Sequence, residues 1–192
     1  CFINQSMTQD FEFTRVSGSY FGQKEACDSA KVFAPGIVST KGYELNSFFS
    51  PDGTEFYFCR YTKSGVKIYY SSLADGFWEK PEQIEFCKNN DGIDVTISPD
   101  GSKLFFSSIR PVHVDSFQNI SHDFWMSVRN GKKWSDPVHL GEKINTKQED
   151  FFPCSINDGT LYFSSQREGA GTNNIYRDRK STRLNSSHGK LS

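Results

Sequence analysis

The chain of 192 residues has a formal charge of −1, and its low hydrophobic content of 35% accompanies an aromatic content of 15% with 18 Phe. The repeats described below hold no cluster of basic residues, so the sequence offers no electrostatic basis for binding nucleic acid. No apolar run approaches the ~20 residues of a transmembrane helix. We expect one domain with a thin core packed by aromatic rings.

Residues 1–31 form a lead segment without repeats. Its first residue, Cys1, would be the lipid anchor of a mature bacterial lipoprotein, and a chain cut at this point is the alternative. The cysteines show no C-x-x-C pair and no metal-ligand spacing, so we predict no metal site, no cofactor and buried thiols rather than disulfides. They are Cys1, Cys27, Cys59, Cys87 and Cys154.

One turn sequence recurs along residues 32–177. SPDG occurs at residues 50–53 and 98–101, and a degenerate copy lies at 156–159. Ser, Pro and Gly at these positions suit a type I turn, and the Gly tolerates the positive φ that returns the chain into a hairpin. An Asp in a turn usually hydrogen-bonds its own backbone, so we interpret six residues as structural. They are Asp52, Gly53, Asp100, Gly101, Asp158 and Gly159.

Each turn lies between similar strands. Innermost strands are predicted at 48–50, at 95–97 and in the run before Asn157. Second strands follow at 56–59, 104–107 and 161–164, where adjacent apolar residues predict cover on both faces. Third strands follow at 67–71, 123–127 and 174–177. Asp75-Gly76 and Asn130-Gly131 then predict tight turns, each followed by W-x-x-P and a short fourth strand. We expect Trp78 and Trp134 to occupy equivalent positions with buried rings.

Four antiparallel strands per repeat are typical of a β-propeller blade. We therefore predict an all-β fold, a partial β-propeller forming an open arc of about two and a half to three consecutive four-stranded antiparallel blades. A β-sandwich is the alternative, but it would show cleaner alternation and no repeated W-x-x-P. The second period exceeds the first because of a polar insertion at 109–122, predicted to be a long loop.

The combination of SPDG, L-x-F-S-S, D-[IF]-W, W-x-x-P and I-N-T resembles the TolB-like, WD-like propeller repeat over about residues 32–177. FAPGIVST at 33–40 also resembles the region that precedes such repeats in bacterial envelope proteins. The resemblance implies a location in the bacterial periplasm or on the outer-membrane or extracellular surface. Departures at Ile156-Asn157, Asn174 and Cys59-Arg60 put in doubt any ligand role that the family would give those positions.

Residues 178–192 leave the repeat pattern. The string resembles the in-frame translation of a common sequencing-adapter oligonucleotide, as in a metagenomic fragment. We predict a non-native tail that packs against nothing, and a natural basic tail is the alternative.

Charged residues recur beside the strands. Acidic residues precede the first strands, and arginines follow the second strands. We expect them to meet near one end of the propeller channel, as ion pairs between blades or as a ring that holds a polar ligand. His113 and His122 in the insertion are further candidates for ligand binding. The recurring residues are Glu44, Asp94, Glu149, Asp150, Arg60, Arg110 and Arg167.

Two classes of function remain, because fold does not give function. The first is a non-catalytic binding or scaffold propeller of the bacterial envelope that recognises a protein or glycan through blade-end loops, including 109–122. The second is a fragment of a propeller glycan hydrolase, or of the propeller domain of a larger peptidase. No H-E-x-x-H, G-x-S-x-G or phosphate-loop motif occurs, so no catalytic residue can be assigned. This favours a binding protein over an enzyme.

Overall fold

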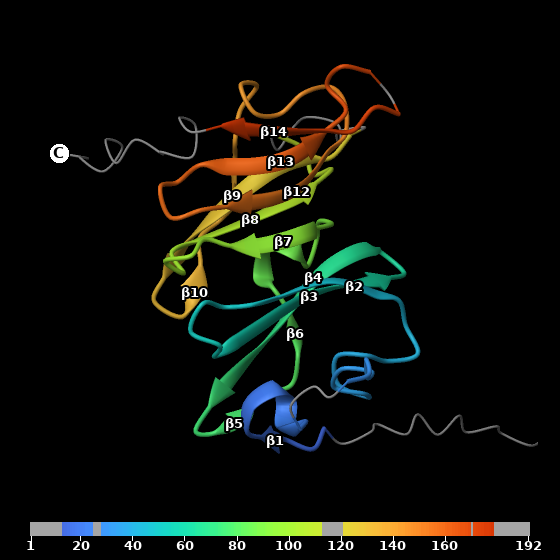
Figure 1. Cartoon of the computed structure of the whole chain (residues 1–192), viewed down its shortest axis with the longest axis vertical. Helices are drawn as coiled ribbons and strands as arrows, with labels where there is room; N and C mark the ends of the chain where they lie inside the picture. The colour runs from blue at the N-terminus through green and yellow to red at the C-terminus, as the bar shows by residue number, and fades with distance from the viewer. Residues whose placement is uncertain (1–12, 25–27, 113–120, 170, 179–192) are drawn as a thin grey trace, which may run out of the picture.

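Three antiparallel sheets stack in chain order along the long axis of the molecule (Figure 1). The computed structural model describes residues 13–24, 28–112, 121–169 and 171–178. Helix in these ranges is limited to two 3-10 turns, η1 (Ser19–Gly22) and η2 (Glu85–Cys87). No helix in the described ranges is sufficiently long and apolar to cross a membrane. The predicted all-β partial propeller of consecutive antiparallel blades is confirmed.

The strands of each blade follow one another in sequence. The first blade contains β2 (Glu44–Phe49), β3 (Glu55–Thr62), β4 (Gly65–Ala74) and β6 (Glu82–Gln83), and β5 (Phe77–Trp78) pairs with both β4 and β1 (Val16–Ser17). The second contains β7 (Ile93–Ile97), β8 (Lys103–Ser108), β9 (Asp123–Asn130) and β11 (Val138–His139), with β10 (Lys133–Trp134) pairing β9. The third contains β12 (Asp150–Ser155), β13 (Leu161–Ser165) and β14 (Asn174–Asp178).

The third blade has three strands in the described part of the chain. Asp178, which the sequence analysis placed in the tail, is the last residue of β14 and lies opposite Leu161. The hydrogen-bond ladder of β13 and β14 therefore continues one residue further than predicted. Residues 179–192 lie outside the described part of the chain, so the predicted tail stays a prediction.

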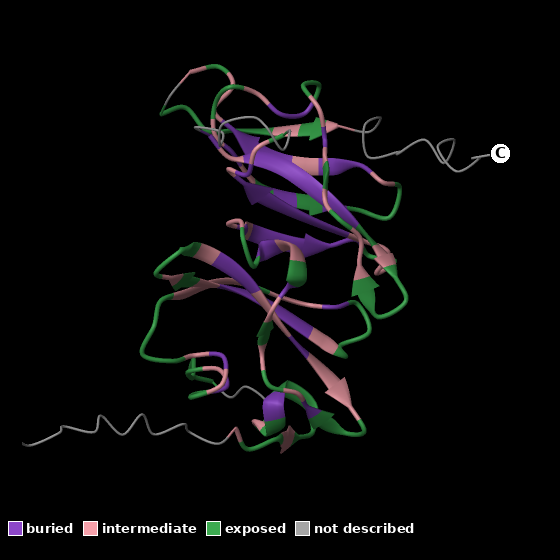
Figure 2. Cartoon of the chain, turned by 180° about the vertical axis from the view of Figure 1, so that it is seen from behind, coloured by how far each residue is buried: buried purple, intermediate pink, exposed green. Residues whose placement is uncertain are grey.

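The second strands carry the core, as their adjacent apolar residues predict. In β3, Phe56 and Phe58 face one side, while Tyr57 and Cys59 face the other, and all four are buried. The apolar side chains of neighbouring sheets pack between them, and Figure 2 shows the buried residues gathered where the sheets face each other. Burial of such rings is the main stabilising contribution to this stack.

The outer face of the first blade is covered by the N-terminal segment. Phe21 stacks on Trp78 with ring centroids 4.2 Å apart, and it also contacts Phe56 edge-on. The Trp78 indole N–H donates to the carbonyl oxygen of Gly18 at 2.9 Å. In the second and third blades, the corresponding face packs on the preceding sheet. In the first blade, the residues before the first repeat cover this face instead.

Trp78 and Trp134 occupy equivalent positions, since they lie opposite Leu73 of β4 and Arg129 of β9. Their burial differs from the prediction. Trp78 is 1% exposed, whereas Trp134 is only partly buried. The reason is the cover: Phe21 lies over Trp78, while Trp134 lies at the margin of the interface between the first two blades.

Cys154 also departs from the prediction of buried thiols, since it is exposed, while Cys59 and Cys87 are buried. It lies in β12, opposite Tyr162 of β13. The corresponding residue of the first blade, Phe48, packs in the interface with the second blade. No described residue lies over Cys154 in the same way.

Candidate functional site

The blades present two different ends. At one end, called here the turn end, lie the tight turns that join first and second strands. At the other, the loop end, the chain enters each first strand and leaves each second strand. Glu44 begins β2 and lies opposite Arg60 near the end of β3, so both belong to the loop end. Asp150 and Ser165 occupy the same places in the third blade.

The turns are held by their own side chains. In the first, Ser50 Oγ donates to Asp52 Oδ1 at 2.6 Å, and the Thr54 amide donates to the same oxygen at 3.1 Å. The second copy repeats both contacts around Asp100, which hydrogen bonds from Ser98 and Ser102 hold at a pKa of about 2. Gly53 and Gly101 have φ of 70° and 73°, which L side chains rarely adopt.

Each repeat arginine at the loop end is bound to the backbone of its own blade. The guanidinium groups of Arg60, Arg110 and Arg167 donate to the carbonyl oxygens of Ile37, Phe86 and Ile144, at 3.2, 3.1 and 2.7 Å. Each guanidinium also lies over aromatic rings, at 5.1 Å or less from Phe58, Phe106 and Phe163 respectively. The arginines therefore fasten the segments that lead into the first strands.

Glu44 and Asp150 share a second arrangement. Each carboxylate accepts the backbone N–H and the hydroxyl of a threonine four residues earlier, Thr40 or Thr146. Arg60 lies 3.0 Å from Glu44, and Arg167 lies 3.5 Å from Asp150. Burial opposes ionisation of Glu44, but the Thr40 hydrogen bonds and Arg60 outweigh it and lower its pKa. Burial raises the pKa of Asp150, which is fully buried.

Asp94 lies two residues further along its strand than Glu44 and Asp150 lie along theirs. It occupies a bulge with a φ of 56°, and Asn46 and Phe152 occupy the corresponding bulges of β2 and β12. The Asp94 carboxylate accepts the Phe152 amide at 3.2 Å and so joins the second blade to the third. Burial raises the pKa of Asp94, with hydrogen bonding by Phe152 and the nearby His122 acting in the opposite direction.

His122 lies between two carboxylates. Its Nδ1 is 2.8 Å from Glu149 Oε2, its Nε2 is 3.7 Å from Asp91 Oδ2, and its backbone N–H donates to Glu149 at 2.9 Å. Asp91 also accepts the Ser108 hydroxyl at 2.8 Å. We call Asp91, Asp94, His122 and Glu149 the loop-end cluster. No group of three or more His, Cys, Asp and Glu in the described ranges is arranged to hold a metal ion.

The predicted ring residues and the separate candidate His122 thus divide into two sets. Arg60, Arg110 and Arg167 bind within their own blades, whereas His122, Glu149 and Asp94 join the second blade to the third. Asp91 was missed by the sequence analysis. Alignment of the repeats could have predicted Asp91, because Asp91 and Glu149 occupy equivalent positions before the bulge residues Asp94 and Phe152. His113 lies outside the described residues.

A cavity of about 510 Å³ opens at the loop end of the second blade, beside the start of β9 and the segment that leads into β12. Within its wall, His139 Nε2 lies 3.1 Å from Asp123 Oδ2, and His139 Nδ1 accepts the Gly141 amide at 3.2 Å. The sequence analysis did not predict this cavity, because its residues come from three separate segments.

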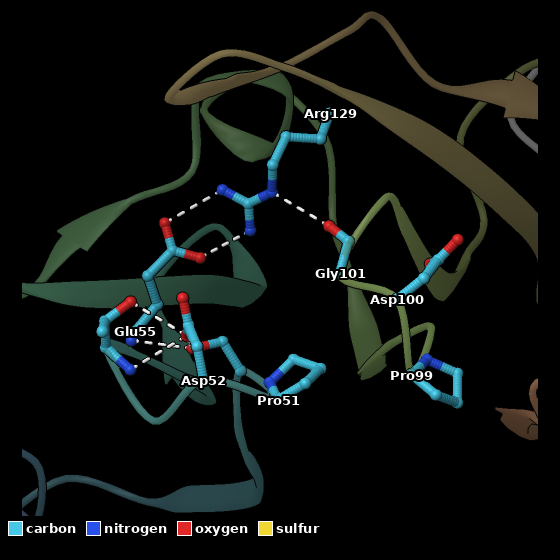
Figure 3. Close-up of a pocket in the computed structure, with 9 residues that line it drawn as sticks. Pro51, Asp52, Glu55, Pro99, Asp100, Gly101 and Arg129 are labelled. Carbon is cyan, nitrogen blue, oxygen red and sulfur yellow. Dashed lines mark hydrogen bonds and ion pairs between the residues drawn. The ribbon is translucent and has the colours of Figure 1, made fainter.

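At the turn end, a smaller groove of about 270 Å³ lies between the first two turns (Figure 3). Arg129 crosses it from the second blade and donates to both oxygens of Glu55, at 3.0 and 2.5 Å, and to the carbonyl of Gly101 at 3.0 Å. The charged groups of Arg129 and Glu55 therefore bind each other. The groove is therefore the site of a clamp between blades.

No protein-family model and no curated protein sequence matches the chain. Among solved structures, it is similar to a putative TolB from Agrobacterium tumefaciens, with a TM-score of 0.52 and 18% identity over 74% of this chain and 48% of that one. A TolB from Acinetobacter baumannii gives 0.47 and 18%, over 73% and 31%. A putative 6-phosphogluconolactonase from Bacteroides uniformis gives 0.43 and 17%, over 77% and 39%.

The chain spans about half the length of the Agrobacterium protein and about a third of the Acinetobacter protein. At these identities the similarity concerns the fold and not the ligand. The first match, together with the three consecutive sheets, supports the resemblance seen in the repeat motifs: the chain folds as part of a TolB-like β-propeller.

Proposed function

We propose that this chain is a non-catalytic binding or scaffold part of a bacterial envelope propeller, which recognises a protein or glycan at its loop end. The observation that carries the proposal is the setting of His122. A histidine that activates a nucleophile needs a hydroxyl or thiol on one ring nitrogen and an orienting group on the other. His122 instead has a carboxylate beside each nitrogen, Glu149 and Asp91.

Exposed aromatic rings support recognition at this end. Tyr43, Tyr61 and Phe152 are 68%, 51% and 63% exposed, and Tyr43 packs edge-on against Tyr61 with centroids 5.2 Å apart. Large aromatic side chains are enriched in protein interfaces, where they supply contact area at low entropic cost. All three lie close to the loop-end start of a first strand or the end of a second.

We also propose a location in the periplasm or on the outer-membrane or extracellular surface, with Cys1 as a lipid anchor. This part rests on the repeat motifs and on the residues before them, and on no contact within the fold. Membrane partition of the parent protein with and without Cys1→Ser tests the anchor.

Binding at the loop end is tested with purified envelope proteins and with immobilised peptidoglycan fragments. We expect Tyr43→Ala and Phe152→Ala to weaken capture at least tenfold, while Phe77→Ala, a partly exposed aromatic away from the loop end, leaves it unchanged. The same samples are assayed for turnover of peptides, glycosides and lactones. Turnover that disappears in His122→Ala would favour the alternatives, a glycan hydrolase fragment or the propeller of a peptidase.

A further inference from the structure

The outer face of the third blade repeats a face that the first blade buries. On the first blade, Tyr57 of β3 and Ile68 of β4 face the second blade, and both are 0% exposed. Tyr162 of β13 and Ile175 of β14 occupy the same register positions, but Ile175 is 75% exposed. With the exposed Cys154 of β12, these two residues form what we call the third-blade face, which the described residues leave open.

At the other end of the stack, the first blade presents the face that receives a preceding sheet in the other blades. Its buried aromatic residues are called here the first-blade face: Phe56, Phe58 and Trp78. The same positions of the second blade, which pack against the first blade, hold Leu104, Phe106 and Trp134. Residues 16–23 cover the first-blade face, with β1 beside β5 (Figure 1), and we call them the N-terminal cover.

The N-terminal cover supplies substitutes for the contacts of a neighbouring sheet. At the interface between the first two blades, the Trp134 indole N–H donates to the Tyr57 hydroxyl at 3.0 Å. At the first-blade face, the Trp78 N–H donates to the Gly18 carbonyl oxygen at 2.9 Å instead. Phe21 supplies the ring that packs beside Trp78. A backbone carbonyl and one phenyl ring thus take the place of a tyrosine-bearing strand.

Residues 32–40 correspond to the fourth strand of a blade and the segment that follows it. The carbonyl oxygens of Val38 and Ile144 each accept an N–H of a repeat arginine, at 2.9 and 2.7 Å. Each lies two residues before the threonine that binds the carboxylate of the next first strand, Thr40 or Thr146. By this spacing, residues 32–33 stand where β11 stands in the second blade. No described strand pairs with them.

Gln23 of the N-terminal cover takes the place of the missing third strand. In the second blade, the Leu140 N–H donates to the carbonyl oxygen of Phe124 in β9 at 3.1 Å. The corresponding N–H, that of Ala34, donates to Gln23 Oε1 at 2.7 Å. Gln23 Nε2 in turn donates to the Val32 carbonyl oxygen at 3.0 Å. One side-chain amide therefore binds the groups that a neighbouring strand binds elsewhere in the fold.

The N-terminal cover also adopts a strained backbone. Tyr20 and Phe21 are consecutive and have φ of 52° and 55°, in the left-handed region that residues with a side chain rarely adopt. Phe21 is the residue that stacks on Trp78. A neighbouring sheet with a hydroxyl and an apolar side chain at the right positions makes equivalent contacts without this strain. The N-terminal cover is therefore replaceable by such a sheet.

We propose that a second copy of this chain docks its third-blade face on the first-blade face and displaces the N-terminal cover. The occupant follows from continuity with the internal interfaces, because the third-blade face repeats the Tyr and Ile of a face that already packs on a following sheet. Two copies related by a twofold axis make this contact twice and close a ring. Three sheets from each copy match the roughly four to eight blades of closed propellers. The inference goes beyond the loop-end function and does not depend on it.

The docked copy replaces each contact of the N-terminal cover. The Tyr162 hydroxyl accepts the Trp78 N–H that Gly18 accepts in the single chain. Ile175 stands where Phe124 stands in β9, so its carbonyl oxygen accepts the N–H that precedes the first blade at residue 34. Residues 32–33 then lie beside β14 as a fourth strand, which the third blade lacks among the described residues.

Sedimentation velocity of the full chain across a dilution series tests the association, and we expect a dimer. Ile175→Asp places a charge in the docked face and should weaken the dimer at least about tenfold. Val138→Asp is the matched control, because Val138 is an exposed β-branched residue of the second blade, which contributes neither face. Phe21→Ala should strengthen the dimer at least about tenfold, since docking no longer has to release the ring from Trp78. If Phe21→Ala does not fold, Gln23→Ala must strengthen the dimer in its place.

A disulfide between copies tests the register. Val138 lies opposite Met126 in the second blade, and the equivalent pair across the docked copies is residue 32 with Arg177. Val32→Cys combined with Arg177→Cys should therefore give a covalent dimer on a non-reducing gel. Val32→Cys combined with Ile156→Cys, at the turn end of the same blade, should not. In both chains Ser first replaces three native cysteines, which are Cys1, Cys27 and Cys154.

The inference is overturned if the chain stays monomeric at every concentration, or if Ile175→Asp leaves a dimer as stable as Val138→Asp does. Open polymers larger than a dimer would contradict the closed ring. Equal yields of covalent dimer from both cysteine pairs would show that another surface holds the copies. None of these results bears on capture at the loop end, which the Tyr43→Ala and Phe152→Ala variants test separately.

Discussion

The interface between the first and second blades and the one between the second and third are both apolar in the middle, but different charged residues link the sheets beside the apolar core. In the first interface, Arg129 pairs with Glu55 at the turn end, and Lys67 Nζ donates to the Asn90 carbonyl oxygen at 2.6 Å near the loop end. In the second interface, His122 contacts Glu149 and Asp94 accepts the Phe152 amide at the loop end. The repeat therefore conserves the apolar contact between sheets and varies the polar one.

A change at equivalent positions explains this difference. Glu55 opens β3 directly after the first turn, and the residue at the same place after the second turn is Lys103. Tyr57, which donates its hydroxyl proton to Glu55 and accepts the Trp134 N–H, is replaced in the second blade by Phe105. The second blade therefore lacks the acid and the hydroxyl that build the clamp between the first two blades.

The apolar middles should give the largest effects when they are broken. Phe106→Ala removes a buried ring from the first interface, and Phe163→Ala removes a buried ring from the second. Each change should lower the free energy of unfolding by about 3–5 kcal/mol, from lost burial and the cavity left behind. Urea denaturation measures both against Val128→Ala as a surface control. A cost below about 1 kcal/mol for either would show that this interface is not packed as described.

The turn-end clamp comes next. Arg129→Met keeps the stem that lies over Trp134 but removes both hydrogen bonds to Glu55, and we expect a loss of about 2–3 kcal/mol. Glu55→Gln and the double variant complete a cycle measured by the same denaturation. The two carboxylate contacts predict coupling of at least about 1 kcal/mol. Additive single effects would mean that Arg129 acts through its packing alone.

This comparison also shows what the sequence could predict. The apolar positions recur in every repeat, so aligning the turns locates the second strands, their double cover and the blade order. The clamp could not be found in this way, because Glu55 and Arg129 each occur in one blade only and meet only once the sheets have stacked. The bulges at Asn46, Asp94 and Phe152 were missed as well, since no Gly marks their positive φ.

The loop end was predicted in part. Position in the repeat predicted that the recurring acids and arginines lie at one end of the stack, and His122 of the insertion lies at the same end. Repeat position could not distinguish the arginines that bind within their own blade from the residues that join two blades. This distinction depends on which partner each side chain reaches in the folded structure. The cavity beside Asp123, His139 and Asn145 depends in the same way on tertiary packing of three segments.

Asp94 gives a smaller effect of opposite sign. Burial raises its pKa, so the folded state favours the protonated carboxyl, and the stability this gives is complete below the unfolded pKa and lost as pH rises through the folded one. Asp94→Asn should therefore be more stable than the parent chain at pH 7 and equal to it near pH 3. Thermal melts across that range measure the difference. Equal melting temperatures at both pH values would contradict it.

Asp100→Asn is the matched control for Asp94, because hydrogen bonds from Ser98 and Ser102 lower the pKa of Asp100 to about 2. Its contribution to stability is complete above the unfolded pKa of about 3.8 and is lost as pH falls toward 2. Asp100→Asn should therefore be less stable than the parent at pH 7, and the gap should close in acid. Asp100 thus stabilises its turn when it is charged, whereas the charge of Asp94 lowers the stability of the fold.

The His122 contact should give the smallest effect. Its side chain is 25% exposed and that of Glu149 is 33%, whereas the values for Arg129 and Glu55 are 23% and 15%. Glu149→Gln keeps an oxygen for the His122 amide but removes the charge, so we expect a loss of about 0.2–1 kcal/mol. One molar NaCl should shrink this loss, because it screens solvent-exposed charges, and should change the loss in Arg129→Met less. A salt-independent loss as large as that of Arg129→Met would mean that the His122–Glu149 contact stabilises its interface as strongly as the Arg129–Glu55 contact stabilises the other. A small, salt-sensitive loss would mean that a partner can compete for Glu149 and Asp91 without separating the blades, since the apolar middle still holds them.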